Sequence, residues 1–167
     1  MAIIVRYAIT STPIGDLVLI SDGGSLSAIS FVDGRTAPTL DATYVRDDAA
    51  FDDASTQLQQ YFAGQRTAFD LPLAPHGTAF QQRVWDAIQK IQYGTTITYG
   101  QIAAKLREPR SVRAVGAANG RNPLPIVIPC HRVVGADGSL RGYGGGLHRK
   151  QWLLAHEGGA LFAEHDD

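Results

Sequence analysis

The sequence predicts an α+β protein with two parts: a small antiparallel sheet with one packed helix, followed by a mainly helical domain. Short β-branched and apolar runs, separated by turn residues, fill the first third of the chain. Capped helical patterns dominate after residue 77. Between the two lies a segment with two prolines, residues 71–76, which is typical of a linker. We therefore expect domains at residues 1–76 and 77–167.

The first domain is expected to contain three strands and one helix. The strands are predicted at residues 3–10, 15–21 and 25–32, with turn signals at residues 12–13, 22–24 and 33–34. Residues 35–49 show no periodicity and are expected to form a surface loop. Apolar residues then recur at helical spacing over residues 50–62, and Gly64 is expected to end that helix.

The second domain is expected to be built from helices. Thr78 with Gln81, and Thr98 with Gln101, form two predicted capping boxes. The helices are predicted at residues 78–91, 98–106, 111–119 and 149–156. Two short helices around a brief turn are typical of a helix-turn-helix. Residues 126–128 are apolar and are expected to form a short buried strand.

Composition and charge exclude several classes of protein. The single cysteine rules out a disulfide framework and a multi-cysteine zinc site, and it fits a reducing cytoplasm. We expect no signal peptide and no membrane span. The net charge of −1 hides an asymmetry, because residues 1–79 carry four basic and nine acidic groups (−5) and residues 80–167 carry eleven and seven (+4). Residues 105–150 carry nine basic and two acidic groups, a balance of +7. This concentration of positive charge indicates either a nucleic-acid surface or a solvated basic face.

The cysteine, Cys130, follows a stiff stretch of chain. Three prolines lie within seven residues before it: Pro123, Pro125 and Pro129. Each proline fixes its own φ angle. A lone cysteine is most often a small buried residue without chemistry. The neighbours His131 and Arg132, however, are residue types that lower the pKa of a thiol, and the thiolate is the nucleophile, so the sequence favours a reactive cysteine.

The motif Pro129-Cys130-His131-Arg132-Val133 resembles the acceptor-cysteine motif of the O6-alkylguanine-DNA alkyltransferases, also called methylated-DNA–protein-cysteine methyltransferases. The resemblance runs from about residue 80 to residue 158, and more weakly through the N-terminal part. It implies a ribonuclease H-like N-terminal domain and a winged helix-turn-helix C-terminal domain.

The resemblance also implies a function, direct-reversal DNA repair. The alkyl group of O6-alkylguanine, and of O4-alkylthymine, would move once and irreversibly from a flipped-out base of double-stranded DNA to Cys130. No cofactor and no metal is implied. The expected protein is cytoplasmic and monomeric, and several copies can lie side by side on DNA.

The resemblance assigns six catalytic positions, which are Cys130, His131, Glu157, Tyr99, Asn122 and Lys150. The histidine contacts the cysteine through a water molecule, and Glu157 holds the far nitrogen of the ring. Tyr99 donates the proton that the leaving guanine needs, Lys150 supports it, and Asn122 joins the recognition helix to the active-site strand. Independently of the resemblance, Glu157 lies near a helix C-terminus, where the helix dipole disfavours a carboxylate, so its position indicates a specific partner.

DNA contacts are implied for Arg113, Ala114, Ala117, Tyr99 and Arg132. Arg113 matches the arginine finger that takes the place of the flipped base, and small residues suit the narrow minor groove. From spacing alone, close helix–helix packing with Arg113 in solvent fits equally well. The alkyl pocket is expected at Tyr143, Gly144, Val133 and Pro125. Gly144 stands where some members carry serine, so a roomier pocket wall is expected.

Two other functions fit parts of the pattern. A cysteine hydrolase would use Cys130, His131 and Glu157 on a carbonyl, but it needs an oxyanion hole and leaves Arg113 unexplained. A non-enzymatic DNA-binding regulator with a redox-active thiol explains the basic stretch, but it does not explain Glu157 or Tyr99.

Overall fold

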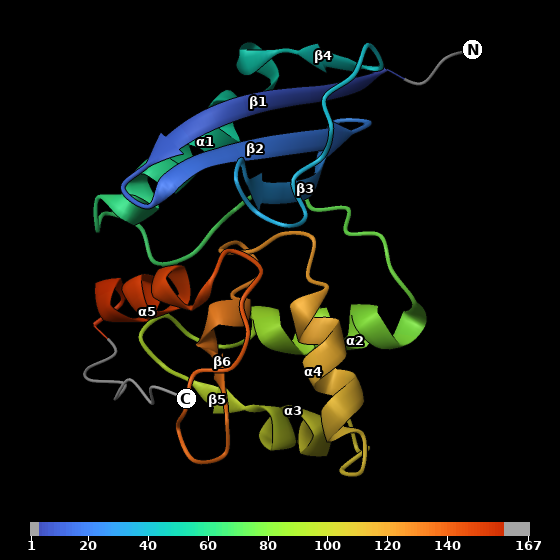
Figure 1. Cartoon of the computed structure of the whole chain (residues 1–167), viewed down its shortest axis with the longest axis vertical. Coiled ribbons are helices and arrows are strands. Elements are labelled where there is room, and N and C mark those ends of the chain that lie inside the picture. Colours follow the sequence, from blue (N-terminus) through green and yellow to red (C-terminus); the bar gives the residue numbers. More distant parts are fainter. Residues whose placement is uncertain (1–3, 159–167) are drawn as a thin grey trace. The chain divides into compact units, whose positions relative to one another are not determined.

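The computed structural model describes residues 4–158, apart from the side chain of Asp22 (Figure 1). It divides into two compact units, Met1–His76 and Gly77–Asp167. The first unit is a sheet with one α-helix, and the second is mainly helical. The predicted α+β class is confirmed.

The sheet of the first unit has four strands in the order β3-β2-β1-β4. Their bounds are Val5–Thr12 for β1, Gly15–Asp22 for β2, Ser25–Phe31 for β3 and Tyr44–Arg46 for β4. The first three strands pair antiparallel, as predicted, whereas β4 pairs parallel with β1. The prediction of an irregular loop over residues 35–49 was therefore wrong at β4. A three-residue edge strand is too short to show a periodic pattern, and backbone pairing alone defines it.

The core of the first unit lies between the sheet and α1, Asp52–Phe62, which follows the short 3-10 helix η1, Asp48–Phe51. On the inner strand β2, Leu17 and Leu19 are fully buried opposite Phe31 and Ile29 of β3. Helix α1 contributes Leu58 and Tyr61, which are also fully buried. The helix ends as predicted just before Gly64, which has a φ of 76°.

The second unit contains four α-helices (Figure 1) among its described residues. They are α2 Ala79–Gln89, α3 Tyr99–Lys105, α4 Val112–Gly120 and α5 Leu147–His156. Both predicted capping boxes are present, at Thr78 for α2 and Thr98 for α3. These helices were predictable because a capping box is a local pattern of two residues.

The approach to Cys130 is a turn, so the prediction of a strand at residues 126–128 was wrong. Pro125 and Ile128 form an isolated bridge, and Ile126 between them has a φ of 76°, outside the range of a strand. Ile126 and Ile128 are nevertheless buried. The chain continues through the 3-10 helix η2, Cys130–Arg132, into β6, Val133–Val134, which pairs parallel with β5, Ile97–Thr98. This pairing fixes the start of α3 next to the cysteine segment.

Gly77, the first residue of the second unit, has no room for a side chain. A Cβ atom there would collide with the indole ring of Trp85, although the backbone itself is exposed. The indole of Trp85 is buried, and its Nε1–H donates a hydrogen bond of 2.9 Å to the carbonyl of Ala118 in α4. Gly77 therefore permits the packing that joins α2 to α4.

Candidate active site

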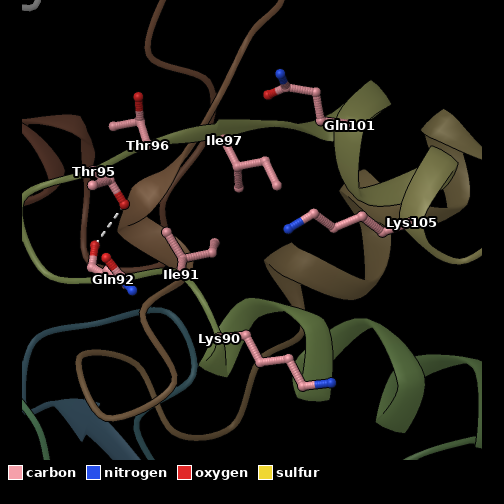
Figure 2. A pocket seen from close by; sticks show the side chains of 8 residues that line it. All are labelled: Lys90, Ile91, Gln92, Thr95, Thr96, Ile97, Gln101 and Lys105. Atoms are coloured by element: carbon pink, nitrogen blue, oxygen red, sulfur yellow. Dashed lines mark hydrogen bonds between the residues drawn. The ribbon is translucent and has the colours of Figure 1, made fainter.

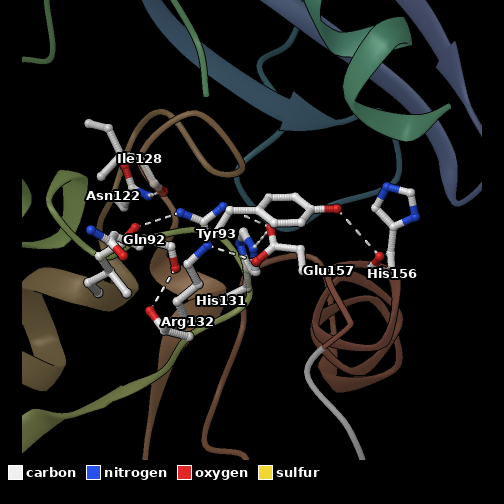
Figure 3. Close-up of polar contacts among 10 residues, drawn as sticks. Gln92, Tyr93, Asn122, Ile128, His131, Arg132, His156 and Glu157 are labelled. Carbon is white, nitrogen blue, oxygen red and sulfur yellow. Dashed lines mark hydrogen bonds and ion pairs between the residues drawn. The ribbon is translucent and has the colours of Figure 1, made fainter. Parts of the chain in front are cut away.

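Cys130 is buried in η2, with an exposed fraction of 6%. Its backbone N–H donates to the carbonyl of Ile128 at 2.7 Å. The same carbonyl accepts a 2.7 Å hydrogen bond from Nδ2 of Asn122, whose Oδ1 accepts from the N–H of Leu124 at 2.9 Å (Figure 3). Asn122 therefore fixes the turn that carries the cysteine.

Burial raises the pKa of the Cys130 thiol above its ordinary value. Several neighbouring groups lower this pKa: a hydrogen bond from Asn122, the charge of Lys150 and the backbone N–H groups of Cys130 and His131. Burial outweighs them. The expectation that the side chains of His131 and Arg132 lower the pKa of the thiol was therefore wrong. A thiol that stays protonated needs a base to remove its proton.

His131 is placed to act as that base. Its Nε2 atom lies 2.8 Å from Oε2 of Glu157, and both side chains are buried (Figure 3). Burial lowers the pKa of His131, although Glu157 raises it in part, so the ring is neutral near neutral pH. Its Nδ1 atom has no hydrogen-bond partner among the residues that the structure describes. The ring is thus held through one nitrogen and keeps the other available to accept a proton.

Arg132 points into the protein, and its predicted contact with DNA is therefore corrected. Its guanidinium donates to both carboxylate oxygens of Glu157, at 2.7 and 2.9 Å, and to the carbonyl of Ile91 at 2.7 Å. The same group lies 5.6 Å from the ring centre of Tyr93. A buried guanidinium with these partners orients Glu157, which in turn orients His131. Sequence reasoning missed Ile91 and Tyr93, because nothing in the sequence links a helix end to a residue forty positions later.

Lys150 is fully buried on α5. Its ammonium donates to the carbonyls of Val133 and Arg141, at 2.7 and 2.8 Å. Burial lowers its pKa to about 8, and the neighbouring Cys130 acts in the opposite direction. Lys150 therefore supplies a positive field near the sulfur.

Tyr99 is the first residue of α3 and is half-buried. Burial raises the pKa of its phenol, the thiolate form of Cys130 raises it further, and Arg141 lowers it. A phenol with a raised pKa stays protonated and can donate a proton or a hydrogen bond near the sulfur.

The residues expected to line the alkyl pocket differ in their surroundings. Tyr143 is buried, its hydroxyl has no partner among the described residues, and burial next to Cys130 raises its pKa well above the ordinary value. Gly144 is exposed, and a Cβ atom there would meet no protein atom within 4 Å. Val133 is fully buried and Pro125 is half-buried. The structure brings Tyr143 close to the cysteine, and it leaves open space at Gly144.

Helix α4 has small residues on both its exposed and its buried face. Arg113, Ala114 and Ala117 are exposed, whereas Val115 and Ala118 are buried. The alternative left open by the sequence holds in part, because Ala118 is buried and its carbonyl accepts the hydrogen bond from Trp85 of α2, while Ala114, Ala117 and Arg113 stay exposed. A narrow, cationic helix face is available to a partner.

A separate pocket of about 530 Å³ lies in the second unit between α2, β5 and α3 (Figure 2). It is lined by Lys90, Ile91, Gln92, Thr95, Thr96, Ile97, Gln101 and Lys105. None of the residues predicted for the site is among them. Within residues 4–158, no group of three or more metal-ligating side chains occurs, and no helix is long and apolar enough to cross a membrane.

Together, the buried thiol, the imidazole held by a carboxylate and the outward cationic helix define a DNA-binding protein with a nucleophilic cysteine. Comparison with known proteins gives the same result. Residues 5–75 match the family "6-O-methylguanine DNA methyltransferase, ribonuclease-like domain", and residues 79–159 match "6-O-methylguanine DNA methyltransferase, DNA binding domain".

Individual relatives match over nearly their whole length. The methylated-DNA–protein-cysteine methyltransferase of Methanosarcina acetivorans is 47% identical over 152 residues, which cover 91% of this chain and 97% of that protein. The crystal structure of Mycobacterium tuberculosis OGT in complex with DNA has a TM-score of 0.86 at 46% identity, covering 92% of this chain and 93% of that one. The chain belongs to the family of methylated-DNA–protein-cysteine methyltransferases, the O6-alkylguanine-DNA alkyltransferases.

Proposed function

We propose that this chain is a direct-reversal DNA-repair protein that moves one alkyl group from O6 of guanine, or from O4 of thymine, to the sulfur of Cys130. The observation that carries the proposal is the buried Cys130 followed directly by His131, whose ring is held by Glu157 at 2.8 Å. Relatives that match over nine-tenths of the chain are methylated-DNA–protein-cysteine methyltransferases. We further propose that residues 77–167 carry the chemistry and the DNA contacts, and that residues 1–76 act as a scaffold.

The first step of the proposed reaction removes the thiol proton. Cys130 and His131 both start neutral, because burial raises the pKa of the thiol and lowers that of the imidazole. A water molecule between Sγ and Nδ1 carries the proton to the ring. Glu157 then stabilises the imidazolium that forms, as the carboxylate does in a hydrolase triad.

The second step transfers the alkyl group. The thiolate attacks the alkyl carbon, a carbon–sulfur bond forms, and the bond from that carbon to the guanine oxygen breaks with its electron pair remaining on the base. Tyr99, which stays protonated, donates a proton to the leaving guanine. Lys150 adds a positive charge that favours the thiolate.

The product is a thioether, and its sulfur is a poor leaving group. Nothing in the proposed mechanism returns the thiol, so each chain acts once. Each step of the proposed transfer uses only protein groups, water and the DNA, and no cofactor or metal enters it.

We propose that α4 is the helix that contacts the DNA. A base must leave the stack to reach a buried sulfur, at a cost of a few kcal/mol that is smaller for a damaged pair. Arg113 would occupy the vacated position, and the exposed Ala114 and Ala117 would allow close approach to the minor groove. The DNA complex of the Mycobacterium tuberculosis relative supports DNA as the partner.

The remaining expectations are part of the same proposal. The protein acts as a monomer, several copies can lie side by side on one duplex, and it works in a reducing cytoplasm where the thiol stays free. A cysteine hydrolase and a redox-sensing regulator are not supported, because the relatives that match about nine-tenths of the chain are methylated-DNA–protein-cysteine methyltransferases.

Intact-protein mass spectrometry after incubation with duplex DNA containing O6-methylguanine tests the proposal. The expected result is one methyl group per chain, mapped to Cys130, with no turnover beyond stoichiometry. The matched control Cys130→Ser should gain no mass. Lesion removal by Cys130→Ser, or many lesions cleared per chain, would refute the proposal. Binding without a change in mass would favour the regulator, and repeated ester hydrolysis would favour the hydrolase.

A further inference from the structure

Helices α1 and α3 end in the same backbone motif but with different residues. At the end of α1, the N–H of Gly64 bonds to the carbonyl of Tyr61 at 3.1 Å, and the next N–H bonds to Gln60 at 2.8 Å. At the end of α3, the N–H of Arg107 bonds to the carbonyl of Ala104 at 3.0 Å, with the following N–H bonding to residue 103 at 3.0 Å. Both patterns are Schellman motifs, which place one residue in the left-handed conformation.

Glycine is the residue that fits this conformation without strain. Gly64 has a φ of 76°, and Gly158, at the corresponding position after α5, also has a φ of 76°. Arg107 has a φ of 60°, although its Cβ atom is crowded in that conformation. A glycine at position 107 would keep both hydrogen bonds and remove the strain. The backbone therefore gives no reason for an arginine here, and the side chain is the feature that distinguishes it from glycine.

The side chain of Arg107 is free to bind a partner. The neighbouring Glu108 is occupied, because Arg83 of α2 donates to its carboxylate at 3.1 Å and to the carbonyl of Leu106 at 2.8 Å. Lys105 points into the pocket between α2 and α3 (Figure 2). The side chain of Arg107 is exposed and forms no hydrogen bond or ion pair with any residue in the described part of the chain. The turn is thus held in place by α2 while its one strained residue projects a cation.

The position of Arg107 indicates which partner it meets. It lies in the turn between the two helices of the helix-turn-helix, ahead of the exposed Arg110 and Arg113. Duplex DNA carries one phosphate charge per about 1.7 Å of its axis, and a guanidinium binds phosphate through two parallel hydrogen bonds. We propose that Arg107 binds a backbone phosphate of the duplex beside the flipped nucleotide. This inference rests on the proposed function, because it requires duplex DNA on α4.

Exchanging the residues at the two Schellman positions separates strain from binding. For Arg107→Gly, we expect the Tm to rise by about 2–4 °C. Its affinity for duplex DNA should fall about 3- to 10-fold, and the slope of log affinity against log salt should become shallower by about 1. The fold-loss of affinity for duplex DNA should exceed any fold-loss in the rate of reaction with free O6-benzylguanine. Arg107→Lys, which keeps the charge, should retain most of the affinity.

The matched control is Gly64→Arg, which creates the same strained arginine in the first unit. Its Tm should fall, while its DNA affinity and salt slope should equal those of the wild type. Wild-type affinity and slope in Arg107→Gly would overturn the proposal, and so would an equal loss of affinity in Gly64→Arg. These binding measurements do not require alkyl transfer, so a failure of the Cys130 chemistry is seen separately in the mass measurement.

Discussion

Buried polar groups differ between the two units. In the described part of the first unit they are neutral, namely Thr10, Ser27, Ser30 and Gln57, and its ion pairs Arg6–Asp47 and Arg46–Asp48 face solvent. In the described part of the second unit, by contrast, the buried side chains include basic and acidic groups, namely His131, Arg132, Arg149, Lys150 and Glu157. Burying a charge costs free energy unless the charge is paired, and hydrophobic residues would often be as stable. The comparison teaches that the second unit retains buried charges at a cost in stability, which is consistent with a role in chemistry, whereas the described part of the first unit avoids that cost.

The largest expected effect follows from Glu157→Gln, which breaks the buried cluster. Losing the carboxylate leaves Arg132 as a poorly compensated buried charge and removes the orienting partner of His131. We expect the free energy of unfolding to fall by about 3–5 kcal/mol, and the alkyl transfer rate of the folded protein to fall at least 100-fold.

The matched change in the first unit is Asp48→Asn, which breaks the exposed pair with Arg46. There the free energy of unfolding should change by less than about 1 kcal/mol, and the rate should not change. Urea unfolding and the rate of Cys130 alkylation measure both variants. Equal losses in the two variants would show that the buried cluster has no special role.

Arg113→Ala tests an exposed charge of the second unit. Because the side chain is exposed on α4, its removal should leave stability within about 0.5 kcal/mol. Repair of duplex DNA should slow about 10- to 100-fold, since only the duplex requires base flipping. The reaction with free O6-benzylguanine should change far less. Similar losses on both substrates would rule out the finger role.

A pH series tests the buried His131. Its folded pKa is lowered, so below the ordinary pKa of about 6.5 the unfolded chain binds a proton that the folded chain does not. The free energy of unfolding should therefore decrease as pH falls below about 6.5, by up to about 1.4 kcal/mol per pH unit from this residue. His131→Gln should flatten that part of the curve. An unchanged slope in the variant would mean that the imidazole titrates alike in both states.

The smallest effect is expected for Tyr143→Phe. The hydroxyl is buried without a partner among the described residues, so its removal takes away an unsatisfied polar group. The Tm should stay the same or rise by about 1–2 °C. A clear fall in Tm would show that the hydroxyl is hydrogen-bonded in solution, for example to water.

The parts of the site that the sequence could predict are those with local signals. The capping boxes at Thr78 and Thr98 were predictable, because each is a pattern of two nearby residues. A specific partner for Glu157 was also predictable, because the helix dipole disfavours a carboxylate at a helix C-terminus. The resemblance placed Arg132 among the DNA contacts, and nothing in the sequence showed which way its side chain points. Only the fold shows that a carboxylate and the carbonyl of Ile91 surround it.

The raised pKa of Cys130 also depended on the fold. Sequence neighbours give the charges near a thiol, but burial is set by residues from several segments and here outweighs those charges. For the same reason β4 and the turn at Ile126 were not predictable, since both depend on backbone geometry rather than on a periodic pattern.

The crowded position at Gly77 has a consequence for the whole second unit. Any side chain there would displace the indole of Trp85, and with it the hydrogen bond that anchors Ala118. A change at the very end of the linker would thus be transmitted to the recognition helix without touching the cysteine. A fusion or truncation placed at the start of the second unit should therefore keep Gly77. Replacing it is expected to weaken the binding of duplex DNA while Cys130 stays reactive.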